Sequence, residues 1–217
     1  MAKEKKMLKP ELMQELRPAM LDEETDAALD EQRDVEGCHF YGENLPKLDG
    51  ECLEFSGCLF ERCSFSDCGA ERLVFVDCIF ETCDLSGMHF PKSTLQRCAF
   101  QDCRMTGVQF TNSVLMNVSF WECLMDFANF SEIKAQHVAF AGCALKESIF
   151  YTVRWQDLVF QECCMQHSEW SHTLMKGLDM RSSEIDGIVV DILNLKGLRV
   201  TRDQALMLSG LLGLKID

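Results

Sequence analysis

Phenylalanine recurs in this chain with a period of five residues, and this period limits what the chain can fold into. Fourteen of the fifteen Phe residues stand at positions divisible by five, and Phe127 is the exception. An α-helix repeats its apolar residues with a period of about 3.6, and a half-buried β-strand alternates them with a period of about 2. Neither period gives five, so neither a helix bundle nor an ordinary sheet explains the pattern.

Cysteine follows the same period. Eleven of the thirteen Cys residues stand two positions before a multiple of five, as in Cys63-Ser64-Phe65, and Val, Ala or Leu fill many of the other positions of this kind. Two apolar positions in every five indicate a chain that turns a corner every five residues. Four such sides close a coil of about twenty residues, and stacked coils pair at the β-strand spacing of about 4.8 Å. The pattern therefore predicts an all-β solenoid, a right-handed quadrilateral β-helix.

These repeats resemble the pentapeptide-repeat family, in particular its Cys-rich variety, in which a central Phe or Leu follows Cys, Ala or Val by two residues. The resemblance covers about residues 38–200. We expect three parts: an acidic N-terminal extension, 1–37, that is partly helical or disordered; the β-helix, 38–200; and a C-terminal helix, 201–217, that caps the solenoid and joins two copies. A solenoid is a scaffold, so the fold alone does not give the function.

Coils of twenty residues stack the cysteines in columns, for example Cys63, Cys83 and Cys103. Such columns suggest disulfides or a zinc site, but two observations favour reduced, metal-free thiols. Val, Ala and Leu share the same positions, and free Cys behaves as a small hydrophobic residue. Side chains on neighbouring coils stay about 4.8 Å apart, beyond the usual Cβ separation in a disulfide, and zinc needs converging ligands.

The two ends of a solenoid expose unpaired coils and need caps. Residues 1–36 carry eleven acidic and six basic residues, and the stretch 11–34 has a helix-like composition that Pro18 interrupts. We interpret it as one or two helices that cover the first coil or are partly disordered; an interaction arm is the alternative. At the other end, Thr201 and Gln204 have the spacing of a capping box, which predicts a helix that starts at 201 or 202 and stops near Gly213.

The C-terminal helix is too apolar for a simple cap, because its leucines are too many for one face of so short a helix. These leucines are Leu206, Leu208, Leu211, Leu212 and Leu214. Some pentapeptide-repeat proteins close with such a helix and dimerise tail to tail through it, so the resemblance implies a homodimer. A monomeric cap is the alternative.

The sequence contains no recognisable catalytic motif. The five His residues occupy outward positions of the repeat, so we expect them on the surface, and we expect no enzyme, no cofactor and no metal. With a net charge of −14, the chain lacks the basic surface with which proteins bind nucleic acid. No apolar run reaches the roughly 18–20 residues of a membrane span, and the charged start lacks the apolar segment of a secretory signal. We therefore expect a cytoplasmic protein that contacts neither nucleic acid nor membrane directly.

Acidic residues dominate the first part of the repeat region. Residues 38–85 contain ten acidic and three basic residues, a net charge of −7, whereas residues 86–200 contain twelve and ten, a net charge of −2. Some pentapeptide-repeat proteins bind DNA gyrase or topoisomerase IV in place of DNA and lessen the effect of quinolones or peptide toxins. The resemblance thus implies a DNA mimic that binds a type II topoisomerase, whereas a solubilising surface also explains the charge. The predicted contact residues are Glu51, Glu61, Glu71, Glu81 and Asp84.

An outward apolar stripe beside the longest Phe column is a second candidate surface. Its residues are Leu59, Ile79, Ala99, Ala139 and Val159. The β-propensity of outward strand positions explains such a stripe, but an apolar stripe can also bind a partner. The alternative function is therefore a general protein-binding scaffold whose partner the sequence does not identify.

Overall fold

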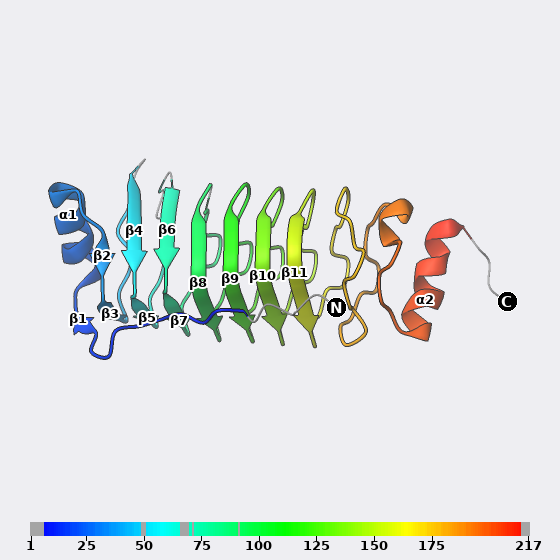
Figure 1. Cartoon of the computed structure of the whole chain (residues 1–217), viewed down its shortest axis with the longest axis horizontal. Helices are drawn as coiled ribbons and strands as arrows, with labels where there is room; N and C mark the ends of the chain where they lie inside the picture. Colours follow the sequence, from blue (N-terminus) through cyan, green and yellow to red (C-terminus); the bar gives the residue numbers. More distant parts are fainter. Residues whose placement is uncertain (1–6, 49–50, 66–69, 71, 91, 214–217) are drawn as a thin grey trace.

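Each coil of the solenoid takes twenty residues. The computed structural model describes residues 7–48, 51–65, 70, 72–90 and 92–213. Its strands pair in parallel with partners twenty residues along the chain, for example Phe80 with Phe100 and Phe100 with Phe120. The coils stack into a rod with the helix α1 (Leu21–Glu31) at one end and the helix α2 (Arg202–Ser209) at the other (Figure 1). The predicted β-solenoid with a C-terminal helix is confirmed.

The β-strands form two adjoining sides of the coil. They are β2 (Val35–Glu36), β3 (Cys38–Tyr41), β4 (Cys52–Ser56), β5 (Leu59–Glu61), β6 (Arg72–Val76), β7 (Ile79–Glu81), β8 (Thr94–Gln101), β9 (Val114–Trp121), β10 (Lys134–Ala141) and β11 (Arg154–Gln161). The long strands β8 to β11 each turn one corner and run along both sides. Isolated parallel bridges, such as those between Gln109 and Asn129 and between Leu124 and Ala144, join the other two sides from coil to coil.

Left-handed backbone torsions make the corners. Four successive corners along the chain are Glu122, Phe127, Glu132 and His137, with φ between 51° and 61°. Residues with a side chain adopt this region rarely, whereas glycine adopts it freely, and the next corner is Gly142 with φ 64°. Phe127, the one Phe outside the period, is therefore a corner residue, and its side chain is 53% exposed.

The aromatic columns predicted from the period fill the interior. Phe80, Phe100 and Phe120 stack with ring centroids 4.4 Å and 5.0 Å apart. Between columns, Phe130 meets Phe140 edge to face at 5.5 Å. Both arrangements add to the apolar area that the rings bury. The first column is Phe40, Phe60, Phe80, Phe100, Phe120, Phe140 and Phe160, and the second is Phe90, Phe110, Phe130, Phe150 and Trp170.

A cysteine or serine at the inward position two residues before a multiple of five can donate a hydrogen bond to the coil below. The Cys83 thiol lies 3.3 Å from the carbonyl oxygen of Phe60, one coil below, and Ser113 donates to the carbonyl of Phe90 in the same way at 2.5 Å. Burial raises the pKa of the Cys98 thiol to about 12, which keeps it protonated at neutral pH. Cys68, which the same period covers, lies outside the described residues.

The N-terminal extension is only partly helical. Helix α1 buries Leu21, Thr25 and Ala28 and contacts β2 and β4, so it covers the first coil. Of the one or two helices expected in this stretch, the structure has one, α1, which follows Pro18; residues 17–18 form strand β1 (Arg17–Pro18), which pairs with β3. The chain before β1 runs back along the outside of the rod past β7 and β8 (Figure 1). We call residues 7–18 the N-terminal strap.

Helix α2 begins where the sequence predicts, but it ends at Ser209, four residues before the predicted end near Gly213. The amide of Gln204 donates to Thr201 Oγ1 at 3.2 Å, and the amide of Thr201 donates to Gln204 Oε1 at 2.8 Å, which completes the capping box. The Gln204 side chain also donates to the carbonyl of Met180 at 2.9 Å and so ties the helix to the solenoid. A 3-10 turn, η2 (Gly210–Leu212), follows the helix, and Gly213 has a left-handed φ of 71°.

Candidate interaction site

One edge of the rod carries a row of carboxylates. Glu61 and Glu81 pair directly in the register of β5 and β7. Asp102, Glu122 and Glu162 follow at the adjoining corner, where they are exposed. We call these five residues the acidic edge. Because neighbouring coils are about 4.8 Å apart, the charges repeat at one-coil or two-coil intervals along the rod.

The structure separates the predicted contact residues. Glu61 and Glu81 lie on the acidic edge, and Asp84 follows Glu81 just past the corner. Glu51 is exposed but stands ten residues, half a coil, before Glu61, and therefore lies on the opposite edge of the rod. Glu71 lies outside the described residues.

Asp84 is partly neutralised. Its carboxylate lies 3.8 Å from Arg104 Nε and accepts a hydrogen bond from the Ser86 amide at 3.0 Å. Burial raises the pKa of Asp84, but the hydrogen bonds from Ser86 and the nearby guanidinium outweigh it, and the pKa stays below its ordinary value. Asp84 is therefore ionised at neutral pH but offers a weaker field than Glu122 and Glu162, which form no ion pair with another described residue.

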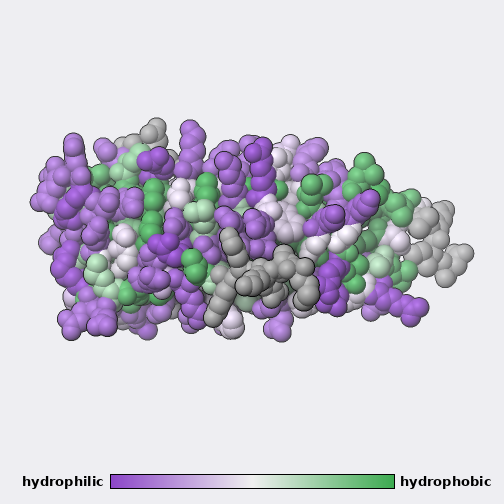
Figure 2. All heavy atoms as spheres, in the orientation of Figure 1, coloured by the Kyte–Doolittle hydropathy of each residue, from purple (hydrophilic) through white to green (hydrophobic). Residues whose placement is uncertain are grey.

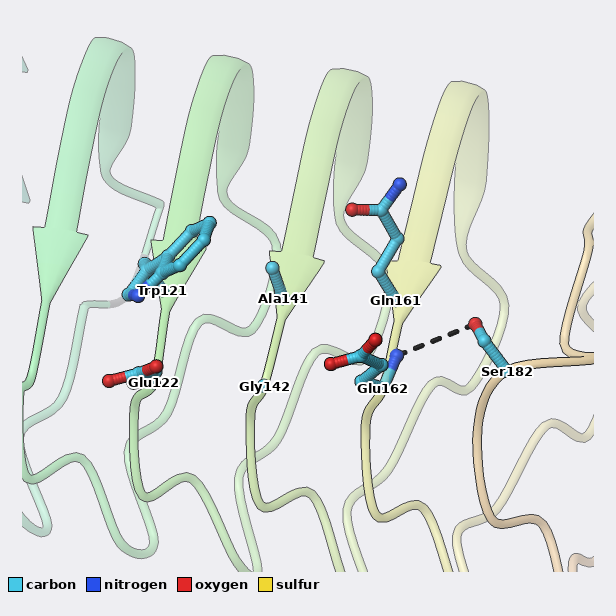
Figure 3. A pocket seen from close by; sticks show the side chains of 7 residues that line it. All are labelled: Trp121, Glu122, Ala141, Gly142, Gln161, Glu162 and Ser182. Carbon is cyan, nitrogen blue, oxygen red and sulfur yellow. Dashed lines mark hydrogen bonds between the residues drawn. The ribbon is translucent and has the colours of Figure 1, made fainter.

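A hollow of about 440 Å³ opens on the acidic edge (Figure 3). The indole of Trp121, whose side chain is 55% exposed, forms one wall. Glu122 and Glu162 stand two coils apart, with Gly142 between them; a Cβ on Gly142 would lie only 3.2 Å from Glu122 Cγ. The full lining is Trp121, Glu122, Ala141, Gly142, Gln161, Glu162 and Ser182.

The five-residue period alone does not reveal this hollow, although the sequence carries a signal for it. Aligning the chain in rows of twenty residues places Gly142 between Glu122 and Glu162. The same alignment places Ala141 one coil beyond Trp121 at the same position of the coil, and these two residues pair in the register of β9 and β10. Two small residues beside two acids and an exposed indole mark a notch in an otherwise regular edge.

The apolar stripe lies on the side of the rod between the acidic edge and the next corner. Its members pair from coil to coil, for example Ile79 with Ala99, and Ser119 interrupts it between Ala99 and Ala139. Val159 is 43% exposed, and the other members are partly exposed. The next corner is the one on which the N-terminal strap lies. We call it the strap corner, and its residues are Asp77, Arg97, Asn117, His137 and Asp157.

The expectation of surface histidines is wrong for His137. This residue is only 7% exposed, and its Nδ1 lies 2.9 Å from Asp157 Oδ2. Met7 of the N-terminal strap lines the same hollow as His137. The repeat register gave the outward direction of the side chain correctly, but it carries no information about a segment that packs on the outside of the rod.

The predicted dimerisation leucines divide into two groups. Leu208 is 8% exposed and belongs to the core of its own chain, whereas Leu206, Leu211 and Leu212 are 56%, 40% and 59% exposed. Leu214 lies outside the described residues.

The exposed leucines lie at an apolar end of the rod. Apolar residues gather at the α2 end of the molecule (Figure 2). Leu193, in the 3-10 turn η1 (Ile192–Leu195), is 89% exposed, and the sequence analysis did not single it out. A hollow of about 510 Å³ lies between this turn and α2, with Leu211 and Leu212 in its wall.

Within the described part of the chain, no three His, Cys, Asp or Glu side chains are grouped so that they could hold a metal ion. The helices described by the structure include none that is long and apolar enough to cross a membrane.

A comparison with protein-family models finds the same kind of repeat that the coil length, the corners and the aromatic columns indicate. The model of the pentapeptide repeat region matches residues 73–150 and 113–190. The chain belongs to the pentapeptide repeat family. A search among curated proteins finds no match.

Three solved structures that match the chain have TM-scores of 0.40 or lower. Full-length QnrB1, a plasmid-mediated fluoroquinolone resistance protein, is 18% identical with a TM-score of 0.40, over 91% of this chain and 95% of that one. A trypsin-treated variant of QnrB1 is 24% identical with a TM-score of 0.38, over 85% of this chain and 90% of that one. HetL, from the cyanobacterium Nostoc sp., is 11% identical with a TM-score of 0.30, over 77% of this chain and 80% of that one.

Proposed function

We propose that this protein is a non-enzymatic, cytoplasmic interaction protein whose acidic edge binds a basic protein surface in the manner of a DNA mimic. The partner that the family resemblance suggests is a type II topoisomerase, DNA gyrase or topoisomerase IV, and binding would modulate sensitivity to quinolones or toxins. The observation that carries the proposal is the hollow between Glu122 and Glu162 beside the indole of Trp121.

This hollow has the chemistry of a receptor for a cationic side chain. An arginine or lysine that enters it would meet two carboxylates and an exposed indole, and carboxylates and the face of an indole attract cations. Neither Glu122 nor Glu162 forms an ion pair within the described residues, so both charges are available. Glu61 and Glu81 extend the negative field along the same edge, as the phosphates of DNA do for a protein that binds it.

The proposal is tested with purified gyrase and topoisomerase IV, in supercoiling and decatenation assays with and without ciprofloxacin. Wild-type protein should change topoisomerase activity or its inhibition by ciprofloxacin, and the effect should weaken steeply with salt because surface charges are screened. The variant Glu122→Gln/Glu162→Gln should reduce this effect at least fivefold. The matched control is Glu51→Gln/Glu132→Gln, which removes the same charge from exposed residues of the opposite edge.

Equal activity of the two double variants would show that net charge, and not the acidic edge, produces the effect. If wild-type protein affects neither enzyme, the alternative function follows: a general protein-binding scaffold with a different partner. The apolar stripe and the strap corner next to it favour that alternative, because both are surfaces outside the acidic edge to which a different partner could bind.

We further propose that two copies join through the α2 end. Leu193, Leu211 and Leu212 are exposed there beside an apolar hollow, and the last coil lacks a further coil to pair with. A two-fold axis at this end would bury the apolar surface of both copies in one self-complementary contact.

A further inference from the structure

The N-terminal strap is held on the rod by its backbone. The amide of Leu8 donates to Asn117 Oδ1 at 3.0 Å, and the amide of Glu11 donates to Asp77 Oδ1 at 3.0 Å. No residue of the strap is fully buried, and Leu8 is 56% exposed. The C-terminal end of the strap is anchored by β1, where the amide of Arg17 donates to the carbonyl of Gly37 at 2.9 Å. The rest of the strap, residues 7–16, runs along the strap corner in the direction opposite to the order of the coils (Figure 1).

The two hydrogen bonds have a common register. Leu8 and Glu11 are three residues apart, which spans about 10 Å in an extended chain. Asp77 and Asn117 are forty residues, or two coils, apart, which spans about 9.6 Å along the rod. Three residues of extended peptide therefore match two coils, and the corner offers side-chain acceptors at that interval.

Apolar contacts flank these hydrogen bonds. On the C-terminal side of Glu11, Met13 Sδ lies 3.0 Å from the position that a Cβ of Gly37 would take, so the glycine leaves room for the thioether. At the N-terminal end of the strap, Met7 lines a hollow of about 450 Å³ together with Trp155 and Val159. The corner therefore presents polar acceptors in the middle, apolar contacts on both sides of them and a hollow where Met7 lies.

We propose that the strap corner is a docking groove for an extended peptide segment and that the N-terminal strap is its intramolecular occupant. The groove recognises amide groups three residues apart through Asp77 and Asn117, and it accepts an apolar side chain where Met7 lies. A partner segment of this chemistry competes with the strap, which acts as an autoinhibitory contact. The groove lies one corner away from the acidic edge, so the inference does not depend on the topoisomerase proposal.

The test uses two variants of the full chain. Leu8→Pro/Glu11→Pro removes both donors, whereas Leu8→Ala/Glu11→Ala keeps the donors and removes the side chains. A synthetic peptide of residues 7–18 is titrated into ¹⁵N-labelled protein. In the proline variant, the peptide should shift the backbone resonances around Asp77 and Asn117 with a midpoint at least tenfold below that of wild type. The alanine variant should behave as wild type, because a tethered strap competes at a high effective concentration.

A third substitution locates the site. Asn117→Gly in the proline background removes one acceptor and keeps the left-handed φ of 56°, so it should raise the midpoint at least threefold. Glu132→Gly, at another corner with φ 59°, is the matched control and should not change it. Equal binding to wild type and the proline variant, no binding to either, or shifts confined to another corner would each overturn the proposal.

Hydrogen exchange of the wild-type protein gives an independent measurement. The amides of Leu8 and Glu11 should exchange at least tenfold faster, relative to their intrinsic rates, than the backbone amides of β9. If the strap amides were as protected as those of β9, the strap would open only with the solenoid, and it could not act as a competitor.

Discussion

Replacing Phe100 with alanine tests the aromatic column on which the solenoid depends. Phe100 is 1% exposed and lies between Phe80 and Phe120, at centroid distances of 4.4 Å and 5.0 Å. A buried Phe→Ala change costs about 3–5 kcal/mol through lost burial and the cavity that remains. Neighbouring rings are fixed by the coil spacing and cannot close that cavity, and each lost ring contact is itself worth about 0.5–1.5 kcal/mol. We therefore expect a loss of about 4–5 kcal/mol in the free energy of unfolding.

The measurement is urea denaturation at fixed protein concentration, followed both by circular dichroism and by tryptophan fluorescence, because repeat proteins can unfold in more than one step. The matched control is Phe127→Ala at a corner, where the side chain is 53% exposed. This control should stay within about 0.5 kcal/mol of wild type. If the two variants unfolded at the same urea concentration, the aromatic column would not carry the core, and the reasoning from the five-residue period to stability would be refuted.

Two further predictions concern the end of the rod and its response to acid. Wild-type protein should sediment at about twice 24.8 kDa. Leu212→Asp should release monomer, whereas the control Leu174→Asp, at an exposed leucine before the last coil, should leave the dimer intact. If both variants or neither dissociated, a dimer through the α2 end would be contradicted. Burial raises the pKa of Asp77, but the hydrogen bonds and charge of Arg97 outweigh it and leave that pKa below its ordinary value. Asp77 thus stabilises the fold above a pH of about 4, and this contribution disappears as the pH falls through the lowered pKa. Asp77→Asn should lower the urea midpoint at pH 7 more than at pH 3, and an equal loss at both would contradict the assignment.

The interior of this protein could be predicted from the sequence because the coil imposes the same environment every five residues. A position such as that of Phe100 holds a large apolar side chain in most repeats, and the position two residues earlier holds a buried Cys or aliphatic residue, so both recur often enough to be seen. The exception at Phe127 follows the same geometry, since it falls on a corner. The capping box at Thr201 could also be predicted, because a cap depends only on residues within one helical turn.

The outward positions carry no such repetition, because solvent accepts many side chains at each of them. Writing the sequence in rows of twenty residues, one row for each coil, still indicates which outward side chains lie together. This alignment places Glu51 and Glu61 on different edges, and it places Gly142 between Glu122 and Glu162. The position of the N-terminal strap cannot be predicted even from that alignment. Its two hydrogen bonds are donated by backbone amides, which every residue except proline possesses, to acceptors as far as 109 residues along the chain. The residue type at Leu8 therefore gives no sign of this hydrogen bond. The bond depends on a corner that exists only after the coils have stacked. The burial of His137 follows from the same contact, and for that reason the repeat pattern predicted it on the surface.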